Sequence, residues 1–219
     1  MIPPHRGGIF FIFGSAFAIL SLTKIYLMKK HLLLIVFLLT ACLSALAQDK
    51  QSLEAAALQM YNNTVAGNYE AVASGTYPKI FEVLPKDKMM ESLKAMLNGD
   101  GYTLMLLKAD PKFEYGPIKK VNDGLYCFVK HDLLMKMSFK EPVSEAESKQ
   151  MTENFKKAMQ TNDITFEAKS NSFTIKKRAD VIFAADKLTK NQWKYMNRAG
   201  GKLMEKMFGP EVLKQLDIK

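Results

Sequence analysis

Residues 125–140 read LYCFVKHDLLMKMSFK, and this stretch decides the fold. Apolar side chains occupy nearly all of its odd positions, whereas most even positions from Lys130 onward are polar. Successive side chains of a strand point to opposite faces, so the alternation predicts one unusually long strand with an apolar face and a face in water. Asp132 falls on the face in water, and His131 is the one strongly polar side chain on the apolar face.

Further strand patterns lie on both sides of this stretch. A hairpin turn signal, Asn122-Asp123-Gly124, directly precedes it, and Gly116-Pro117 interrupts the run before that turn. Residues 173–186 predict either one long strand or two short ones, and a polar turn at residues 187–191 separates them from the last strand. The expected strands are residues 102–108, 112–121, 125–140, 164–168, 173–186 and 192–197.

Helical spacing of apolar side chains appears at both ends of the remaining sequence and once between strands. Ser144 and Glu147 form a capping box, and Gly209-Pro210 predicts a break in the last helix. The expected helices are residues 51–66, 68–73, 86–97, 144–160 and 201–218. Helices followed by antiparallel strands predict an α+β fold.

The N-terminus has the pattern of an export signal. From Met28, a basic start (residues 29–31) precedes an apolar run (residues 32–39) and the small-residue box Ala45-Leu46-Ala47. This order is typical of a secretory signal peptide with its cleavage site. We therefore expect a signal peptide at residues 28–47 and a periplasmic or secreted protein.

Two alternatives concern this N-terminal region. Leu39-Thr40-Ala41-Cys42 matches a lipoprotein box, in which a lipidated Cys42 would anchor the protein to a membrane, although the apolar residues that follow favour the soluble product. Residues 1–27 hold a second apolar run at residues 9–22, which is shorter than the ~20 residues of a membrane span. We interpret residues 1–27 as a mis-assigned extension, with a membrane segment as the alternative.

The mature chain, residues 48–219, is expected to be a single, mildly basic domain. The formal net charge of +9 includes four basic side chains before residue 48, where no acid occurs. The remaining charge is too small for a nucleic-acid signature, so no nucleic-acid partner is expected. Cys127 is the one cysteine of this domain and can form no internal disulfide, and its apolar neighbours predict a buried thiol.

This order of elements resembles the nuclear transport factor 2-like superfamily, the cone-shaped α+β fold that includes ketosteroid isomerases. The residues that carry the resemblance are Gly67-Asn68-Tyr69-Glu70, the long strand 125–140, the pair Asp180 and Asp186, and Gln192-Trp193-Lys194-Tyr195. The resemblance implies N-terminal helices packed on a curved, cone-like antiparallel sheet around an apolar pocket. Helix 144–160 would then be an inserted helix, and residues from Gly201 would form a C-terminal helical tail. The superfamily hosts isomerases, dehydratases, ligand binders and interaction modules, so it implies no chemistry.

The candidate pocket residues lie on the long strand. If its apolar face lines the cone, His131 points inward, and the expected ligand-binding residues are Tyr126, Cys127, His131, Leu133 and Met135. A buried imidazole can act as a general base or bind the polar end of a ligand. The other interpretation is a core histidine with one backbone or tyrosine partner. No carboxylate lies on the apolar face, so no catalytic set is predicted and His131 is the single, weak catalytic candidate.

Motifs for other kinds of site are missing from the sequence. No ligand spacing for a metal and no Gly-rich phosphate loop occur, so no metal and no cofactor are expected. Methionines suited to a deformable pocket or to core filling recur on apolar positions: Met89, Met90, Met96, Met105, Met135, Met137, Met151 and Met159. The first hypothesis is an exported, non-enzymatic domain that binds a small apolar ligand or a protein partner in a concave pocket. The alternatives are an isomerase or lyase with His131 as base, and a homodimeric interaction module that pairs through its sheet.

Overall fold

The computed structural model describes residues 49–218. The expected signal peptide at residues 28–47, the extension at residues 1–27 and the lipoprotein alternative at Cys42 lie outside the described residues. Contacts divide the chain after Gln51, and the compact unit that starts at Ser52 carries the whole sheet. Within the described residues, no helix has both the length and the apolar character needed to cross a membrane.

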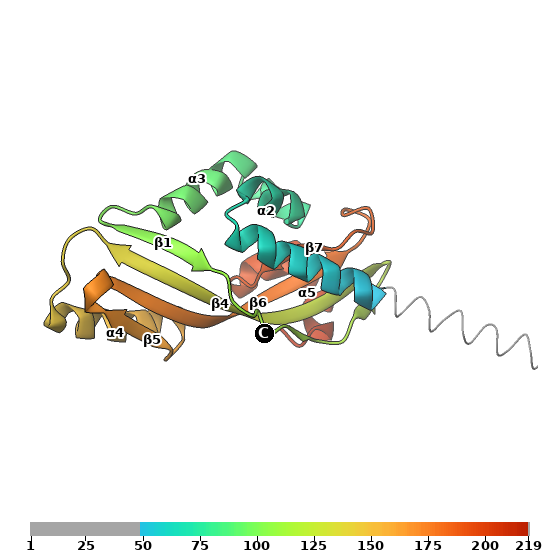
Figure 1. The fold of residues 1–219 in the computed structure, drawn as a ribbon. Helices are drawn as coiled ribbons and strands as arrows, with labels where there is room; N and C mark the ends of the chain where they lie inside the picture. The colour runs from blue at the N-terminus through green and yellow to red at the C-terminus, as the bar shows by residue number, and fades with distance from the viewer. Residues whose placement is uncertain (1–48, 219) are drawn as a thin grey trace, which may run out of the picture. The chain divides into compact units, whose positions relative to one another are not determined.

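The long strand is the centre of a curved, seven-stranded antiparallel sheet (Figure 1). It forms β4, Gly124–Phe139, and it pairs along its full length with β6, Ser172–Ala185. The other edge of β4 holds β1 (Tyr102–Leu107), β2 (Glu114–Tyr115) and β3 (Lys119–Val121). At opposite ends of β6 lie β5 (Ile164–Glu167) and β7 (Lys194–Asn197). The prediction of one unusually long strand is confirmed, and residues 173–186 form one strand rather than two.

The helices match the sequence expectation, and local caps explain where they begin. The first helix covers residues 49–65 of the described chain and is followed by α2 (Tyr69–Gly75), η1 (Pro78–Glu82), α3 (Lys86–Leu97), α4 (Glu145–Met159) and α5 (Gly201–Gln215). The expected capping box of α4 is present, because Ser144 and Glu147 bond each other's backbone N–H groups. The break in α5 also occurs where it is expected, at Gly209, whose φ is 77°.

One face of the sheet packs on the N-terminal helices. The first helix, α2 and α3 lie on the same side of the sheet (Figure 1). Leu53, Ala57 and Met60 of the first helix pack against the odd-numbered residues Cys127 and Val129 of β4. Further along the same strand, Met135 and Met137 join a second cluster, which also contains Leu97, Leu104, Phe173 and Ile175. The α+β fold with helices on a curved antiparallel sheet is therefore as predicted.

The opposite face of the sheet is not simply in water, and that part of the prediction is wrong. At the Gly124 end of β4, helix α5 covers the even-numbered side chains, with Tyr126 buried and Phe128 partly buried. The helix contributes Met204, Met207, Phe208 and Val212 to this third cluster. Because both sides of the sheet are covered here, Tyr126 and Cys127 are both buried although they point to opposite faces. The alternation of buried and solvated positions begins only beyond this end.

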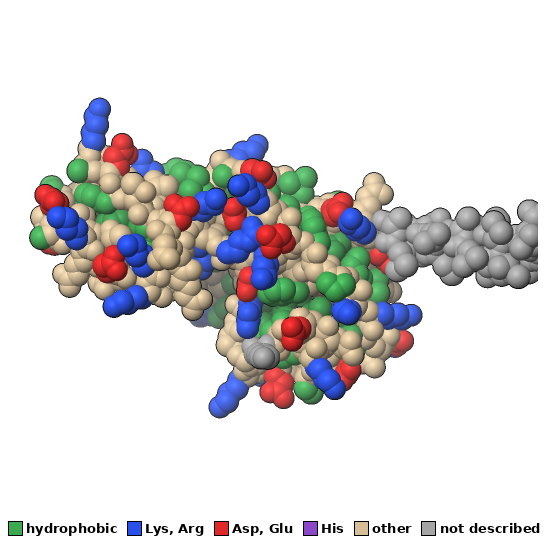
Figure 2. All heavy atoms as spheres, turned by 90° about the horizontal axis from the view of Figure 1, so that it is seen from below, with side chains coloured by type: hydrophobic (Ala, Val, Ile, Leu, Met, Phe, Trp, Pro, Cys, Tyr) green, Lys and Arg blue, Asp and Glu red, His purple; other side chains and the backbone are tan. Residues whose placement is uncertain are grey.

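Asp132 was expected to face water, but ion pairs cover it. Its side chain is 13% exposed and lies 2.8 Å from Arg178 and 3.3 Å from Lys176. Burial disfavours the carboxylate, but hydrogen bonds from the two cations outweigh it and lower the pKa of Asp132. Figure 2 shows basic and acidic side chains interspersed over the face seen from below, with no large patch of one sign.

Two of the methionines predicted on apolar faces are exposed. Met105 of β1 is 58% exposed and Met96 of α3 is 49% exposed. Strand β1 is an edge strand that pairs with β4 alone, and its buried side chain is Leu104, so Met105 points to the uncovered side. In α3, only Leu97 is fully buried. The sequence pattern identified these elements but overestimated how much of each is covered.

Candidate functional site

His131 lies in a closed aromatic cluster. Its side chain is 4% exposed, and its ring centre lies 5.9 Å from that of Tyr61 and 5.6 Å from that of Phe113. Its Nδ1 donates to the Asp132 carbonyl oxygen at 3.2 Å. Burial lowers the pKa of His131 below its ordinary value, although that hydrogen bond opposes the shift. The imidazole is thus packed between the first helix and the 110–113 loop.

The other expected ligand-binding residues are distributed over different parts of the core, with Tyr126, Cys127 and Met135 in three separate clusters. Cys127 is fully buried, as predicted, and burial raises the pKa of its thiol to about 11. Met135 belongs to a different cluster further along β4, and Tyr126 points to the opposite face of the sheet. Leu133 is half-buried. None of these residues lines any of the pockets described below.

The burial of His131 predicts a pH dependence of stability. The folded-state pKa is depressed below 6.5, so below that pH the unfolded chain binds a proton that the folded chain does not. The contribution of neutral His131 to the free energy of unfolding is therefore complete above pH 6.5. It falls as the pH drops, by at most about 1.4 kcal/mol per pH unit. We expect urea unfolding at pH 7 and pH 5 to show this loss, and His131→Phe to reduce it. Parallel pH profiles for the two proteins would contradict the assignment.

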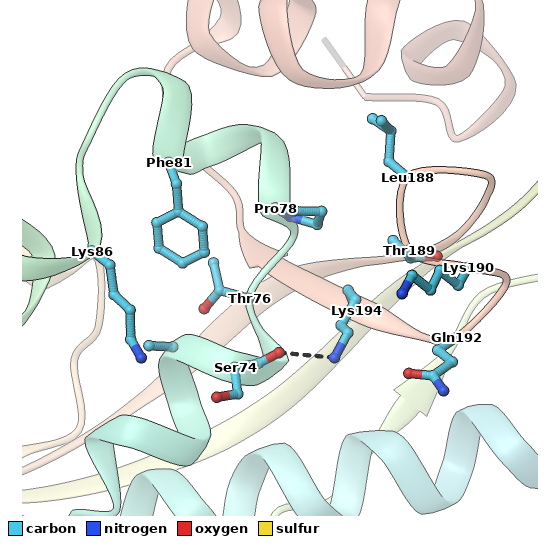
Figure 3. A pocket seen from close by; sticks show the side chains of 11 residues that line it. Ser74, Thr76, Pro78, Phe81, Lys86, Leu188, Thr189, Lys190, Gln192 and Lys194 are labelled. Atoms are coloured by element: carbon cyan, nitrogen blue, oxygen red, sulfur yellow. Dashed lines mark hydrogen bonds between the residues drawn. The ribbon is translucent and has the colours of Figure 1, made fainter.

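A lysine-lined cleft of about 360 Å³ lies at the end of the sheet that carries β7 (Figure 3). One wall comes from α2 and η1 and the other from the turn between β6 and β7. We call it the lysine cleft, and its lining residues are Ala73, Ser74, Thr76, Pro78, Phe81, Lys86, Leu188, Thr189, Lys190, Gln192 and Lys194. Two further pockets are one of about 190 Å³ beside Trp193 and one of about 440 Å³ between α4 and the loop before it.

The charge of the lysine cleft is one-sided. Lys86, Lys190 and Lys194 line it, and no aspartate or glutamate is among its lining residues. Lys86 lies 2.7 Å from Glu70, which stands outside the cleft, and the Lys194 Nζ donates to the Ser74 carbonyl oxygen at 2.8 Å. Figure 3 shows these two ammonium groups on either side of Ser74. Lys190 makes no ion pair with a described residue, so the cleft favours an anion.

Apolar side chains complete the cleft. Pro78 and Phe81 of η1 face Leu188 across the opening (Figure 3). Leu188 is 59% exposed and is therefore accessible to a ligand in the cleft. Apolar walls with a few convergent polar groups are the usual composition of small-molecule sites. Chemically, the cleft can hold a negatively charged group against lysine donors and cover an apolar part with Phe81 and Leu188.

A buried carboxylate joins the two walls. Asp186 is 8% exposed, and its Oδ2 accepts from the Tyr77 hydroxyl at 2.7 Å and from the Tyr126 hydroxyl at 3.3 Å. Its Oδ1 accepts from the backbone N–H of Thr189 at 3.0 Å. Burial and then the Asp186 charge raise the pKa of Tyr126 to about 12, so both tyrosines stay protonated donors. Asp186 therefore holds η1 and the β6–β7 turn together.

The turn itself places its lysine in the cleft. Lys190 and Asn191 both have left-handed backbones, with φ of 55° and 59°. Non-glycine residues adopt this conformation rarely, and it persists only where the surroundings fix it. Here the N–H of Asn191 donates to the Asp186 carbonyl oxygen at 2.7 Å, and that of Lys190 to Lys187 at 3.2 Å. These bonds fix the turn that carries Lys190, which lines the cleft.

The sequence predicted a polar turn at residues 187–191 and a further turn after Tyr77, but it did not indicate that the two segments are in contact. Tyr77 and Asp186 are 109 positions apart, and no spacing rule connects them. The available signals were Asp186 itself and the Gln192-Trp193-Lys194-Tyr195 segment, both of which belong to the resemblance described above. Within residues 49–218 we find no group of three or more His, Cys, Asp and Glu side chains arranged to hold a metal.

The chain matches no known protein family, and no curated protein is significantly similar to it.

Proposed function

We infer that this protein binds a small organic anion in the lysine cleft and that it acts as a binding domain rather than as an enzyme. The observation that carries this proposal is the convergence of Lys86, Lys190 and Lys194 on a cleft whose lining contains no acid. A bound carboxylate would gain charge-assisted hydrogen bonds from these donors. The apolar part of the ligand would cover Phe81 and Leu188. This burial would stabilise the complex by roughly 25 cal/mol for each Å² of apolar surface removed from water.

The proposal includes export and a superfamily resemblance. The signal-peptide pattern at residues 28–47 supports a periplasmic or secreted location, with anchoring at Cys42 as the alternative. Helices packed on a curved antiparallel sheet support the resemblance to the nuclear transport factor 2-like superfamily. The ligand site moves, however, from the middle of β4 to the β7 end of the sheet, because Tyr61 and Phe113 enclose His131.

Hexanoate and 1-hexanol test the need for a negative charge, because they share one apolar chain. In two-dimensional NMR of the ¹⁵N-labelled protein, hexanoate should shift the amide signals of residues 186–194. We expect 1-hexanol to bind about tenfold more weakly, since it offers the lysines no charged acceptor. Equal affinities for the two compounds would count against an anion site.

Lys190 and Lys187 form a matched pair of variants in the same turn. Lys190 lines the cleft, whereas Lys187 points outside and pairs with Asp123 at 2.7 Å. Lys190→Met should weaken hexanoate binding about three- to tenfold, and Lys187→Met should leave it unchanged. If both substitutions weaken binding equally, the effect arises from the overall charge of the protein and the cleft is not the site.

A further inference from the structure

The lysine cleft adjoins a second, smaller pocket. We call this the indole pocket, and its lining residues are Ala56, Gln59, Met60, Asn63, Ala71, Ser74, Gly75, Trp193, Lys194 and Tyr195. Ser74 and Lys194 line both pockets. The indole pocket has about 190 Å³, which is below the range of roughly 300–1,000 Å³ that is typical of small-molecule sites. It therefore fits better as an extension of the lysine cleft than as a separate site.

Lys194 stands at the boundary between the two pockets. One donor of its ammonium group is used by the Ser74 carbonyl oxygen at 2.8 Å. An ammonium group has three donors, so two remain for a ligand that lies on either side. The Ser74–Lys194 contact can be seen in Figure 3 as the dashed line at the α2 side of the cleft. A ligand that spans both pockets would place its negative group here.

The indole pocket offers a different chemistry from the lysine cleft. The side-chain amides of Gln59 and Asn63 line it, and neither makes a hydrogen bond with another described residue. Each amide has both a donor group and an acceptor oxygen. Trp193 adds an aromatic surface, and its indole N–H is fixed because it donates to the Ser52 hydroxyl at 3.0 Å. Free amides beside an aromatic ring suit a ring that carries several hydroxyl groups on an apolar frame.

The floor of the indole pocket is held rigidly. The Tyr195 hydroxyl donates to the Val72 carbonyl oxygen at 3.0 Å. A Cβ on Gly75 would lie 2.6 Å from the Tyr195 ring, so only glycine lets α2 approach the ring this closely. The spacing between α2 and β7 is thereby fixed, and a preformed site loses little entropy when it binds.

An extended peptide is a poorer occupant than a saccharide. Peptides commonly bind by adding a strand to a free sheet edge. Here the outer edge of β7 is taken, because Thr76 bridges to Tyr195 and the N–H of Tyr77 donates to the Tyr195 carbonyl oxygen at 2.8 Å. The two pockets therefore present side chains rather than a row of backbone groups. A plain acyl chain would offer no hydrogen bonds to the Gln59 and Asn63 amides, whereas sugar hydroxyls would.

We propose that the two pockets form one elongated site for an acidic saccharide, with a sugar ring beside Trp193 and its carboxylate at Lys194. This inference rests on the proposed function, since the lysine cleft supplies the anion-binding half. A second sugar unit would lie in the cleft, where Lys86 and Lys190 can donate to a further carboxylate and Phe81 supplies an apolar surface. The ligand class is thus a short oligomer of uronic acid units.

Digalacturonate, cellobiose and hexanoate are the probes that test this assignment. Trp193 is the only tryptophan of the chain, so tryptophan fluorescence reports directly on the indole pocket. Digalacturonate should change the emission and bind about tenfold more tightly than the neutral disaccharide cellobiose. Hexanoate should bind in the lysine cleft without changing the emission. Lys194→Met should weaken digalacturonate about tenfold.

Variants of the two amide side chains test whether the indole pocket contributes to binding separately from the lysine cleft. Asn63→Ala combined with Gln59→Ala should weaken digalacturonate about tenfold and leave hexanoate affinity unchanged. Asn62→Ala is the matched control, because Asn62 is an exposed neighbour on the same helix and lines neither pocket. It should have no effect on either probe.

The outcomes distinguish the two proposals. Suppose that hexanoate binds, but digalacturonate leaves the Trp193 emission unchanged or binds the Gln59→Ala, Asn63→Ala variant as tightly as the wild type. The saccharide site is then wrong, and the anion site in the lysine cleft stands. Equal affinity for cellobiose and digalacturonate would also overturn the acidic-saccharide assignment. If neither hexanoate nor digalacturonate binds, both proposals are wrong.

Discussion

Replacing Phe173 with alanine is expected to lower the free energy of unfolding by about 3–5 kcal/mol, the range for removing a large aromatic side chain from a packed core. Phe173 is fully buried. Its ring centre lies 4.7 Å from that of Phe166, 5.1 Å from Phe155 and 5.9 Å from Phe139. These partners belong to β5, α4 and β4, so one ring joins three elements to β6. Urea unfolding of the purified protein measures the loss.

A graded variant checks that packing is the cause. Phe173→Leu keeps most of the apolar volume and should cost clearly less than alanine, because the cavity that it leaves is smaller. The edge contacts with Phe155 and Phe139 would still be lost. A loss below about 1 kcal/mol for Phe173→Ala would contradict the packing described, because it is no more than an average substitution costs.

Replacing Asp186 with alanine is expected to cost about 3 kcal/mol or more, since the carboxylate serves three buried donors. Without it, the hydroxyls of Tyr77 and Tyr126 and the backbone N–H of Thr189 lose their acceptor. Each buried donor left unpaired costs about 1–3 kcal/mol. The two walls of the lysine cleft should separate as well, so hexanoate binding should weaken together with stability.

Two other substitutions define the cause of this loss. Asp186→Asn keeps a carbonyl oxygen in the same place and should cost less than alanine. Asp123→Ala removes an acid that pairs on the surface with Lys187, the residue after Asp186. Exposed ion pairs contribute little, so this variant should unfold like the wild type. If Asp186→Ala behaves like Asp123→Ala in urea, the buried network does not hold the walls together.

The elements of this fold could be predicted because their signals are local. The period of two in residues 125–140, the hairpin signal before it and the Ser144–Glu147 capping box each act within a few residues. The covering of the second sheet face could not be predicted in the same way. Its one signal was the unbroken apolar run from Leu125 to Val129, which marks a segment buried on both sides. What covers it, α5, lies far along the chain.

The candidate site was harder to predict because tertiary packing creates it. His131 carried the strongest local signal, a polar side chain on an apolar face, and the structure explains that signal by packing against Tyr61 and Phe113. Lysines on a turn and at the start of a helix are ordinary surface residues in a sequence. They become a cleft only because Asp186 bonds Tyr77 across the fold.

The full-length pairing of β4 with β6 also governs the order in which the chain can fold. Residues 125–138 must meet residues 172–185, with α4 and β5 in the intervening segment. Closing such a long loop before any burial is gained makes folding slow. The clusters that bury Val129 and Met135 also need Val181 and Ile175 of β6. If the chain is exported, as proposed, and crosses the membrane unfolded, its sheet stays incomplete until β6 has crossed as well.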